Sequence, residues 1–316
     1  MKIYCLVALL LLGSCHVALL GQPIAANVHR VMFLGNSITY AGGYVEDFEA
    51  YYVSRHPKDS IAFIDLGLPS ETVSGLSEEG HADGRFPRPD LHERLHRILE
   101  KIRPDLVFAC YGMNDGIYLP FDTGRFQRFK EGMQWLHDTL VASSGARVIF
   151  LTPPVYDEVR GGKPGYAAVL DRYAVWLLGQ RRAVQWEVAD IHFPMKRYLD
   201  AHRRVDADFG VDGFALTTDG VHPGEVGHWL MARKLLLYVG EKDVVRYSGI
   251  KAAMAGVPNG DTILRLVKER QTMMKDAWLT WTGHKRPEMP VGLPMEEAGL
   301  KAEVIERQLR GLLRSN

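Results

Sequence analysis

The sequence predicts an α/β fold in which helices cover both faces of a mainly parallel sheet, giving three layers. Short apolar runs bounded by turn residues recur along the chain, and segments with helical spacing separate them. Strands and helices that alternate in this way are typical of a parallel sheet covered on both faces. The length of 316 residues also suffices for one large domain with an appendage.

The elements follow one another in a regular order. The apolar runs predict strands at 31–34, 61–66, 106–111, 148–151 and 184–189. Apolar residues at helical spacing predict helices at 45–55, 90–102, 125–141 and 166–180. After residue 239 the alternation of strands and helices ends. Two amphipathic helices are predicted there, at 262–278 and 295–313, with a proline-rich connector at 287–294 between them. We therefore expect a leader, a main domain and a helical C-terminal extension, at 1–26, 27–245 and 246–316.

The leader has the pattern of an export signal. Met1-Lys2 gives a basic start, and residues 3–12 form an apolar run that is too short for a membrane span. The segment 12–15, Leu-Gly-Ser-Cys, resembles a bacterial lipobox that would place a lipid anchor on Cys15, while cleavage near Gly21 or Ala26 is the competing interpretation. The expected location is periplasmic, extracellular or lipid-anchored to a bacterial membrane.

Composition excludes several classes of function. The 38 basic and 38 acidic residues give no net charge, so no general attraction to nucleic acid is expected. No Walker A or dinucleotide fingerprint occurs, and no cofactor is predicted. Of the three cysteines, Cys5 and Cys15 lie in the leader and Cys110 lies in a predicted strand, which excludes an intramolecular disulfide in the mature chain. Cys110 is expected to be a packed small residue.

Three residues have the types and order of a serine hydrolase triad. Ser37 follows the first predicted strand, and Asp219 and His222 stand three residues apart in one predicted turn. A serine hydroxyl is a poor nucleophile at neutral pH, so Ser37 needs an imidazole to accept its proton and a carboxylate to orient that imidazole. The order Ser, Asp, His matches α/β-hydrolases, but their G-x-S-x-G elbow is absent, which disfavours that fold.

Two further residues follow neighbouring strands. Ser70 comes after the second predicted strand and Asn114 after the third. Open α/β sheets bind ligands at the carboxyl ends of their strands, so both are expected to lie near Ser37. The Asn114 amide and the backbone N–H groups of Ser37 and Ser70 are the predicted donors to an oxyanion.

Together these segments resemble the SGNH family, also called GDSL-type hydrolases, over about 31–239. The first block of that family is Gly35-Asn36-Ser37 here, the third is 112–115 (Gly-Met-Asn-Asp), and the fifth is 219–222 (Asp-Gly-Val-His). The resemblance implies a three-layer α/β/α sandwich with a flavodoxin-like sheet. It also implies a serine esterase that acts through an acyl-enzyme and needs no metal.

The chain departs from the family pattern at two positions. Asn36 replaces the first-block aspartate, which removes a charge but none of the triad groups. Ser70 stands where the second block usually has glycine, so its backbone donor persists if the turn does not require positive φ.

Other interpretations of these residues remain. Ser37 is also a candidate helix N-cap, Asn114 a turn former, and the 219–222 segment a cap for a helix that starts at Pro223. The sequence His92-Glu93-Arg94-Leu95-His96 matches H-E-x-x-H and would indicate a zinc metallopeptidase. The two histidines flank the apolar stripe of their predicted helix, away from the strand ends, which disfavours a metal site.

The predicted substrate is an ester, and O-acetyl groups on a carbohydrate are the first choice. A lipase-like or thioesterase-like activity of the same fold, and a catalytically silent carbohydrate-binding relative, are the alternatives. An aromatic and basic cluster, with Trp278, Trp281 and Arg286, precedes the connector and is a packing face, a cover over the site or a sugar-stacking platform. Arg85 and Arg88, in a proline-rich loop, are not placed in the site.

Overall fold

The computed structural model describes residues 21–209 and 213–314. The leader prediction up to residue 20, with the lipid anchor at Cys15, therefore lies outside the described residues. Within those two ranges, no helix combines the length and the apolar character that a membrane span requires. The predicted limits between leader, main domain and extension stay predictions.

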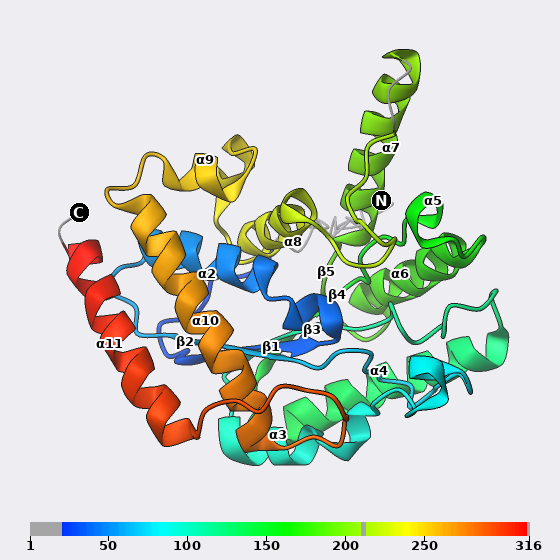
Figure 1. Cartoon of the computed structure of the whole chain (residues 1–316), viewed down its shortest axis with the longest axis horizontal. Coiled ribbons are helices and arrows are strands. Elements are labelled where there is room, and N and C mark those ends of the chain that lie inside the picture. Colours follow the sequence, from blue (N-terminus) through cyan, green and yellow to red (C-terminus); the bar gives the residue numbers. More distant parts are fainter. Residues whose placement is uncertain (1–20, 210–212, 315–316) are drawn as a thin grey trace, which may run out of the picture.

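A five-stranded sheet forms the centre of the molecule (Figure 1). Every neighbouring pair of strands is parallel, and the order is β2-β1-β3-β4-β5. The strands are β1 (Arg30–Gly35), β2 (Ala62–Gly67), β3 (Leu106–Cys110), β4 (Arg147–Leu151) and β5 (Glu187–Ala189). This is the flavodoxin-like order, so the predicted fold class is confirmed.

Helices cover both faces of the sheet. On one face lie α2 (Gly43–Arg55) and α8 (Glu225–Tyr238), which pack against each other (Figure 1). On the opposite face lie α3 (Leu95–Ile102), α4 (Thr123–Ser144) and α6 (Tyr166–Ala183). The remaining short elements are α1 (Ser37–Tyr40), α5 (Glu158–Gly161), α9 (Ile250–Met254) and the 3-10 turns η1 (His81–Gly84), η2 (Leu91–Glu93) and η3 (Lys242–Arg246).

Burial explains why these residues form central strands. All residues of β3 are buried, and β1 is buried from Val31 to Gly35. Phe33 of β1 stacks on Phe108 of β3 at 5.1 Å between ring centroids, and Phe48 of α2 packs edge-on against both rings. Strands covered on two faces need side chains of this kind, which is why the sequence shows continuous apolar runs there.

One predicted helix is interrupted in the structure, and one long observed helix was not predicted. The predicted helix 90–102 is interrupted at Arg94, whose φ of −122° separates η2 from α3. The long helix α7 (His192–Phe209) was missed, although Met195 and Leu199 are buried at helical spacing. Its many polar residues obscure that pattern, and Figure 1 shows α7 projecting from the body.

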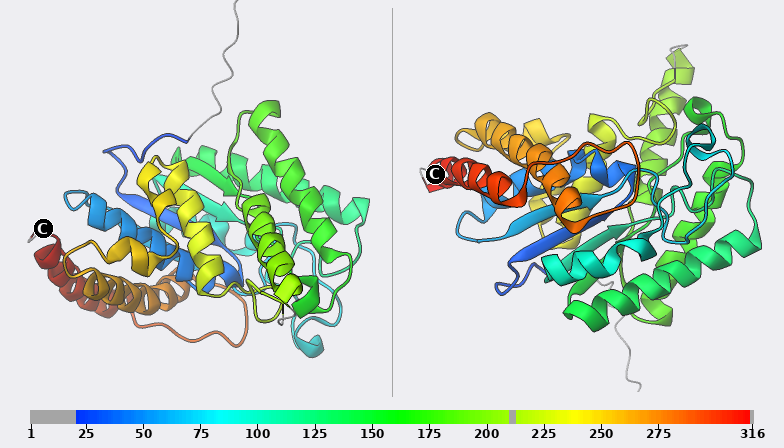
Figure 2. Two further views of the ribbon diagram at one scale, coloured as in Figure 1. Left: turned by 90° about the horizontal axis from the view of Figure 1, so that it is seen from above. Right: turned by 60° about the horizontal axis from the view of Figure 1, so that its bottom comes forward.

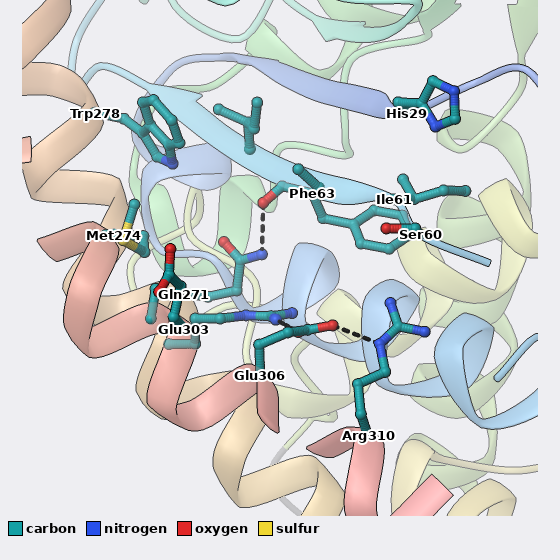
Figure 3. A pocket seen from close by; sticks show the side chains of 15 residues that line it. His29, Ser60, Ile61, Phe63, Gln271, Met274, Trp278, Glu303, Glu306 and Arg310 are labelled. Atoms are coloured by element: carbon teal, nitrogen blue, oxygen red, sulfur yellow. Dashed lines mark hydrogen bonds and ion pairs between the residues drawn. The ribbon is translucent and has the colours of Figure 1, made fainter. Parts of the chain in front are cut away.

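The C-terminal helices α10 (Gly260–Thr282) and α11 (Met295–Arg314) lie side by side along the β2 edge of the sheet (Figure 2). Gln271 of α10 donates its amide to the Phe63 carbonyl at 2.9 Å and to Glu49 at 2.6 Å. Figure 3 shows the hydrogen bond from Gln271 to Phe63 beside a cavity of about 540 Å³, which lies between β2 and the two helices. The helices thus cover an edge strand that would otherwise expose unpaired backbone groups.

Candidate active site

The candidate site residues lie after the ends of adjacent strands. Ser37 comes two residues after β1, Ser70 three residues after β2, and Asn114 four residues after β3. Since β1 pairs with both β2 and β3, the three loops start from neighbouring points on one edge of the sheet. The tertiary structure therefore places these sequence-predicted residues as the parallel topology requires.

Ser37 is the first residue of α1 and not its N-cap. The N-cap is Asn36, which is 1% exposed and whose Oδ1 accepts the Ile38 N–H at 3.1 Å. Asparagine and aspartate are about equally good N-caps, so the departure from the family aspartate leaves this turn intact. The interpretation of Ser37 as a cap is therefore wrong, and its hydroxyl is available for other contacts.

His222 connects Ser37 to Asp219. Its Nδ1 lies 2.6 Å from Oδ2 of Asp219, and its Nε2 lies 2.8 Å from Oγ of Ser37. Because the carboxylate accepts a hydrogen bond from Nδ1–H, Nε2 is left without a hydrogen and is the acceptor for the serine hydroxyl. The three side chains are thus hydrogen-bonded in series across 185 residues of sequence. The side chains of His222 and Asp219 remain 43% and 51% exposed.

The Asp219 turn holds its own geometry. Oδ1 of Asp219 accepts the backbone N–H groups of Val221 and His222 at 2.9 and 2.8 Å, and Gly220 has φ +85°. Partial burial raises the pKa of Asp219, but the hydrogen bonds from the His222 side chain and these two N–H groups outweigh it and leave the pKa below its ordinary value. The helix that follows, α8, has its N-cap at Gly224, so Pro223 does not start it.

Asn114 is buried and fixed by two hydrogen bonds. Its Nδ2 donates to the Glu71 carbonyl at 3.1 Å, and its Oδ1 accepts the Tyr118 hydroxyl at 3.0 Å. An amide nitrogen carries two protons, so one N–H of Asn114 remains for another acceptor.

The Ser70 turn corrects one sequence-based expectation. Leu68, Pro69, Ser70 and Glu71 form a turn in which the Glu71 N–H donates to the Leu68 carbonyl at 3.2 Å. The sequence-based expectation made the Ser70 donor depend on a turn without positive φ. Ser70 has φ +67°, so that condition is not met. Proline followed by a residue with positive φ is the pattern of a type II turn, in which glycine is favoured at that third position. The backbone N–H groups of Ser37 and Ser70 have no acceptor within the described ranges.

Asp115 joins the second and third loops, a role that the sequence did not reveal. Its Oδ1 accepts the N–H groups of Val73 and Ser74, both at 2.9 Å, and its Oδ2 accepts that of Gly112 at 2.8 Å. The residue is fully buried. In the sequence, only its position directly after Asn114 could have indicated this role.

The H-E-x-x-H segment does not form the helix face that a zinc site needs. The helix breaks between its two histidines, at Arg94. Nδ1 of His92 lies 2.6 Å from Asp90, and the ring of His92 stacks on Trp135. In 21–209 and 213–314 no three His, Cys, Asp or Glu side chains are grouped as metal ligands. The charged side chain of Arg94 enters the core together with Leu95, and Arg94 is 1% exposed.

A hydrogen-bonded Ser, His and Asp beside a parallel sheet is the arrangement of a serine hydrolase of the SGNH type. The family model described as "GDSL-like Lipase/Acylhydrolase family" matches residues 33–230. The chain therefore belongs to the GDSL-like lipase/acylhydrolase family and is an ester-hydrolysing enzyme.

Solved structures share the fold at low sequence identity. A catalytic mutant of Axe2, an acetylxylan esterase from Geobacillus stearothermophilus, matches with TM-score 0.53 and 19% identity, covering 69% of this chain and 97% of that one. BT4096, a gut microbial diltiazem-metabolizing enzyme, matches with TM-score 0.54 and 22% identity over 69% of this chain. The match covers 49% of BT4096, so this chain corresponds to about half of that protein. No curated protein sequence matches the chain.

Proposed function

We propose that this enzyme is a serine esterase that removes O-acetyl groups from a carbohydrate through an acyl-enzyme on Ser37. The observation that carries the proposal is the series of hydrogen bonds from Ser37 through His222 to Asp219. Oγ of Ser37 forms a bond to the ester carbonyl carbon while its proton passes to Nε2 of His222. The alcohol then leaves with that proton, and water releases acetate from Ser37 by the reverse sequence of transfers.

The negative oxygen of the tetrahedral intermediate needs donors that are already in place. We assign this role to the remaining Asn114 amide proton and to the backbone N–H groups of Ser37 and Ser70. The hydrogen bonds that Glu71 and Tyr118 make to Asn114 hold its amide group before substrate arrives. Prior orientation of this kind lowers the barrier because little rearrangement is needed during reaction.

The openness of the triad supports an ester carried on a large molecule. The side chains of His222 and Asp219 are about half exposed, so an acetyl group on a polymer surface can approach them. The shared fold with a protein described as an acetylxylan esterase points to the same substrate class. An exported location, with or without lipid on Cys15, belongs to the proposal because such polymers lie outside the cell.

Hydrolysis assays test the proposal directly. We expect the wild-type protein to hydrolyse p-nitrophenyl acetate faster than longer acyl esters and to release acetate from acetylated xylan. Ser37→Ala and His222→Ala should each lower kcat at least about 10³-fold. Ser60→Ala and His96→Ala, which change the same residue types outside the site, should keep full activity.

Four other outcomes contradict the proposal. Preference for long acyl chains would indicate a lipase-like activity, and preference for thioesters would indicate a thioesterase. Binding of glycan without hydrolysis of any ester would indicate a carbohydrate-binding protein. Full activity in Ser37→Ala would show that the nucleophile lies elsewhere.

A further inference from the structure

The second-block turn carries a backbone conformation that its sequence disfavours. Ser70 has φ +67° at the third position of the turn, where a side chain is strained and glycine is preferred. A serine at this position would favour a type I turn, in which φ is about −90°. Some contact outside the turn must therefore stabilise the observed form.

The two turn types differ in the direction of one peptide group. Between type I and type II, the angles on both sides of the Pro69–Ser70 peptide change by roughly 150 to 170°, so this peptide turns over. Its carbonyl oxygen and the Ser70 N–H point in opposite directions because the peptide is trans. A group that binds the Pro69 carbonyl therefore also fixes the direction of the Ser70 N–H.

Arg286 is that group. Its Nε donates to the Pro69 carbonyl at 3.0 Å, from a position 217 residues further along the chain. The guanidinium also lies over the Phe86 ring at 5.2 Å, and its NH1 group donates to the Pro287 carbonyl at 2.8 Å. Arg286 is half-buried, so water competes less for this bond than at an open surface.

The segment that carries Arg286 is anchored near Ser37 as well. On the preceding helix α10, Lys275 donates to the Tyr40 carbonyl at 2.9 Å, and Asp276 accepts the Tyr40 hydroxyl at 2.8 Å. Tyr40 is the last residue of α1, the helix that begins with Ser37. The C-terminal extension thus contacts the two segments that present Ser37 and Ser70.

We propose that Arg286 is a positioning residue, which holds the Pro69–Ser70 peptide in the type II direction so that the Ser70 N–H faces the oxyanion. This inference rests on the proposed function, because the oxyanion forms only if Ser37 attacks an ester. It gives the extension a role in the reaction and explains how serine replaces glycine in this turn.

Arg286→Ala tests the proposal through kinetics. We expect kcat on p-nitrophenyl acetate to fall about 10- to 100-fold, because removal of a whole oxyanion donor costs about 10²- to 10³-fold. KM should change less than about 2-fold, since the donor acts mainly on the transition state. Arg286→Lys retains a donor, so its kcat should lie between those of wild type and Arg286→Ala. Arg85→Ala is the matched control, because Arg85 contacts Glu288, two residues after Arg286, but not the turn.

A second substitution separates positioning from simple docking of the connector. Glycine after Pro69 favours the type II turn without help, so Ser70→Gly should restore the kcat of Arg286→Ala to within about 3-fold of wild type. Wild-type kcat in Arg286→Ala, or a double variant as slow as the single one, would overturn the proposal. A crystal structure of Arg286→Ala should show negative φ at Ser70, and a retained positive φ would equally overturn it.

Failure of the proposed function gives a different result. In that case the wild-type protein hydrolyses no ester, or Ser37→Ala remains active. The φ of Ser70 in the Arg286→Ala crystal structure still decides whether Arg286 controls the turn.

Discussion

Glu71 and Arg94 form a two-pronged ion pair that is buried beneath the Ser70 turn. Nε and an Nη nitrogen of Arg94 lie 2.6 and 2.7 Å from the two carboxylate oxygens of Glu71, and both residues are 1% exposed or less. Tyr111 donates to the same carboxylate at 2.6 Å. Since the Glu71 carbonyl accepts the Asn114 amide, this ion pair supports two of the proposed oxyanion donors.

Arg94→Met should destabilise the protein strongly. Loss of the guanidinium leaves the Glu71 carboxylate buried without its partner, which costs about 3–5 kcal/mol of unfolding free energy. Urea unfolding measures the effect, and Glu71→Gln combined with Arg94→Met should recover part of the loss. Arg265→Met removes an exposed pair with Glu269 on α10 and should cost less than about 1 kcal/mol. Equal losses for the two single variants would contradict the assigned role of the buried pair.

Asp219→Asn should lower kcat about 10²- to 10⁴-fold with little change in melting temperature. Because the asparagine oxygen accepts the two backbone N–H groups, its NH2 group faces Nδ1 as a donor, so the His222 tautomer that accepts the Ser37 proton is no longer favoured. The turn itself should persist, because an asparagine oxygen still accepts the Val221 and His222 N–H groups. Steady-state kinetics and thermal unfolding are the measurements, and a variant within about 3-fold of wild type would exclude Asp219 from the triad.

Tyr118→Phe should reduce kcat about 3- to 10-fold. The variant loses one hydrogen bond to the Asn114 oxygen, a contribution of about 1 kcal/mol, and the amide becomes less well oriented. Asn114→Ala should cost more, about 10²- to 10³-fold, because the donor itself is removed. Tyr198→Phe, on α7, is the matched control for loss of a tyrosine hydroxyl. An unchanged kcat in Asn114→Ala would rule out its proposed role.

Asp65→Asn should remove part of the pH dependence of stability. Burial raises the pKa of Asp65 to about 7, and its Oδ2 has no partner within the described ranges. Between pH of about 4 and 7 the folded carboxyl thus holds a proton that the unfolded one has released, so the unfolding free energy falls as pH rises.

The variant should therefore lose less stability than wild type between pH 4 and pH 7, by roughly 2–4 kcal/mol in urea unfolding. Asp138→Asn is the control, because hydrogen bonds from His137 and Gln134 lower the pKa of this exposed carboxyl. Parallel stability curves for wild type and Asp65→Asn would show that the buried carboxyl does not titrate in this range.

Chelation should leave ester hydrolysis unchanged. His92 is engaged by Asp90 and Trp135, and the helix break at Arg94 separates it from His96. We expect full activity after dialysis against EDTA, and also in His92→Ala and His96→Ala. Metal analysis of the purified protein completes the test, and activity that is lost with chelator and regained with Zn²⁺ would restore the metallopeptidase hypothesis.

Features that depend on local pattern were readable from the sequence. Apolar runs and helical spacing predicted five strands and most of the large helices, and the order of the strands with their loops predicted where Ser37, Ser70 and Asn114 would meet. The Asp-x-x-His spacing predicted a turn in which the carboxylate reaches the imidazole. These features are local because hydrophobic periodicity and short-range hydrogen bonds involve residues that are close in sequence.

Features that depend on distant partners were decided by the tertiary structure. Arg94 stands inside the H-E-x-x-H segment, yet a carboxylate 23 residues away draws it into the core. Ser70 adopts positive φ against its own preference, and Arg286 reaches the neighbouring carbonyl from 217 residues away. No local pattern specifies such contacts, because their energies arise only when the folded chain buries both partners together. The sequence by itself determined the sheet and the chemical types at its edge, and the packing of distant segments decided how those groups are held.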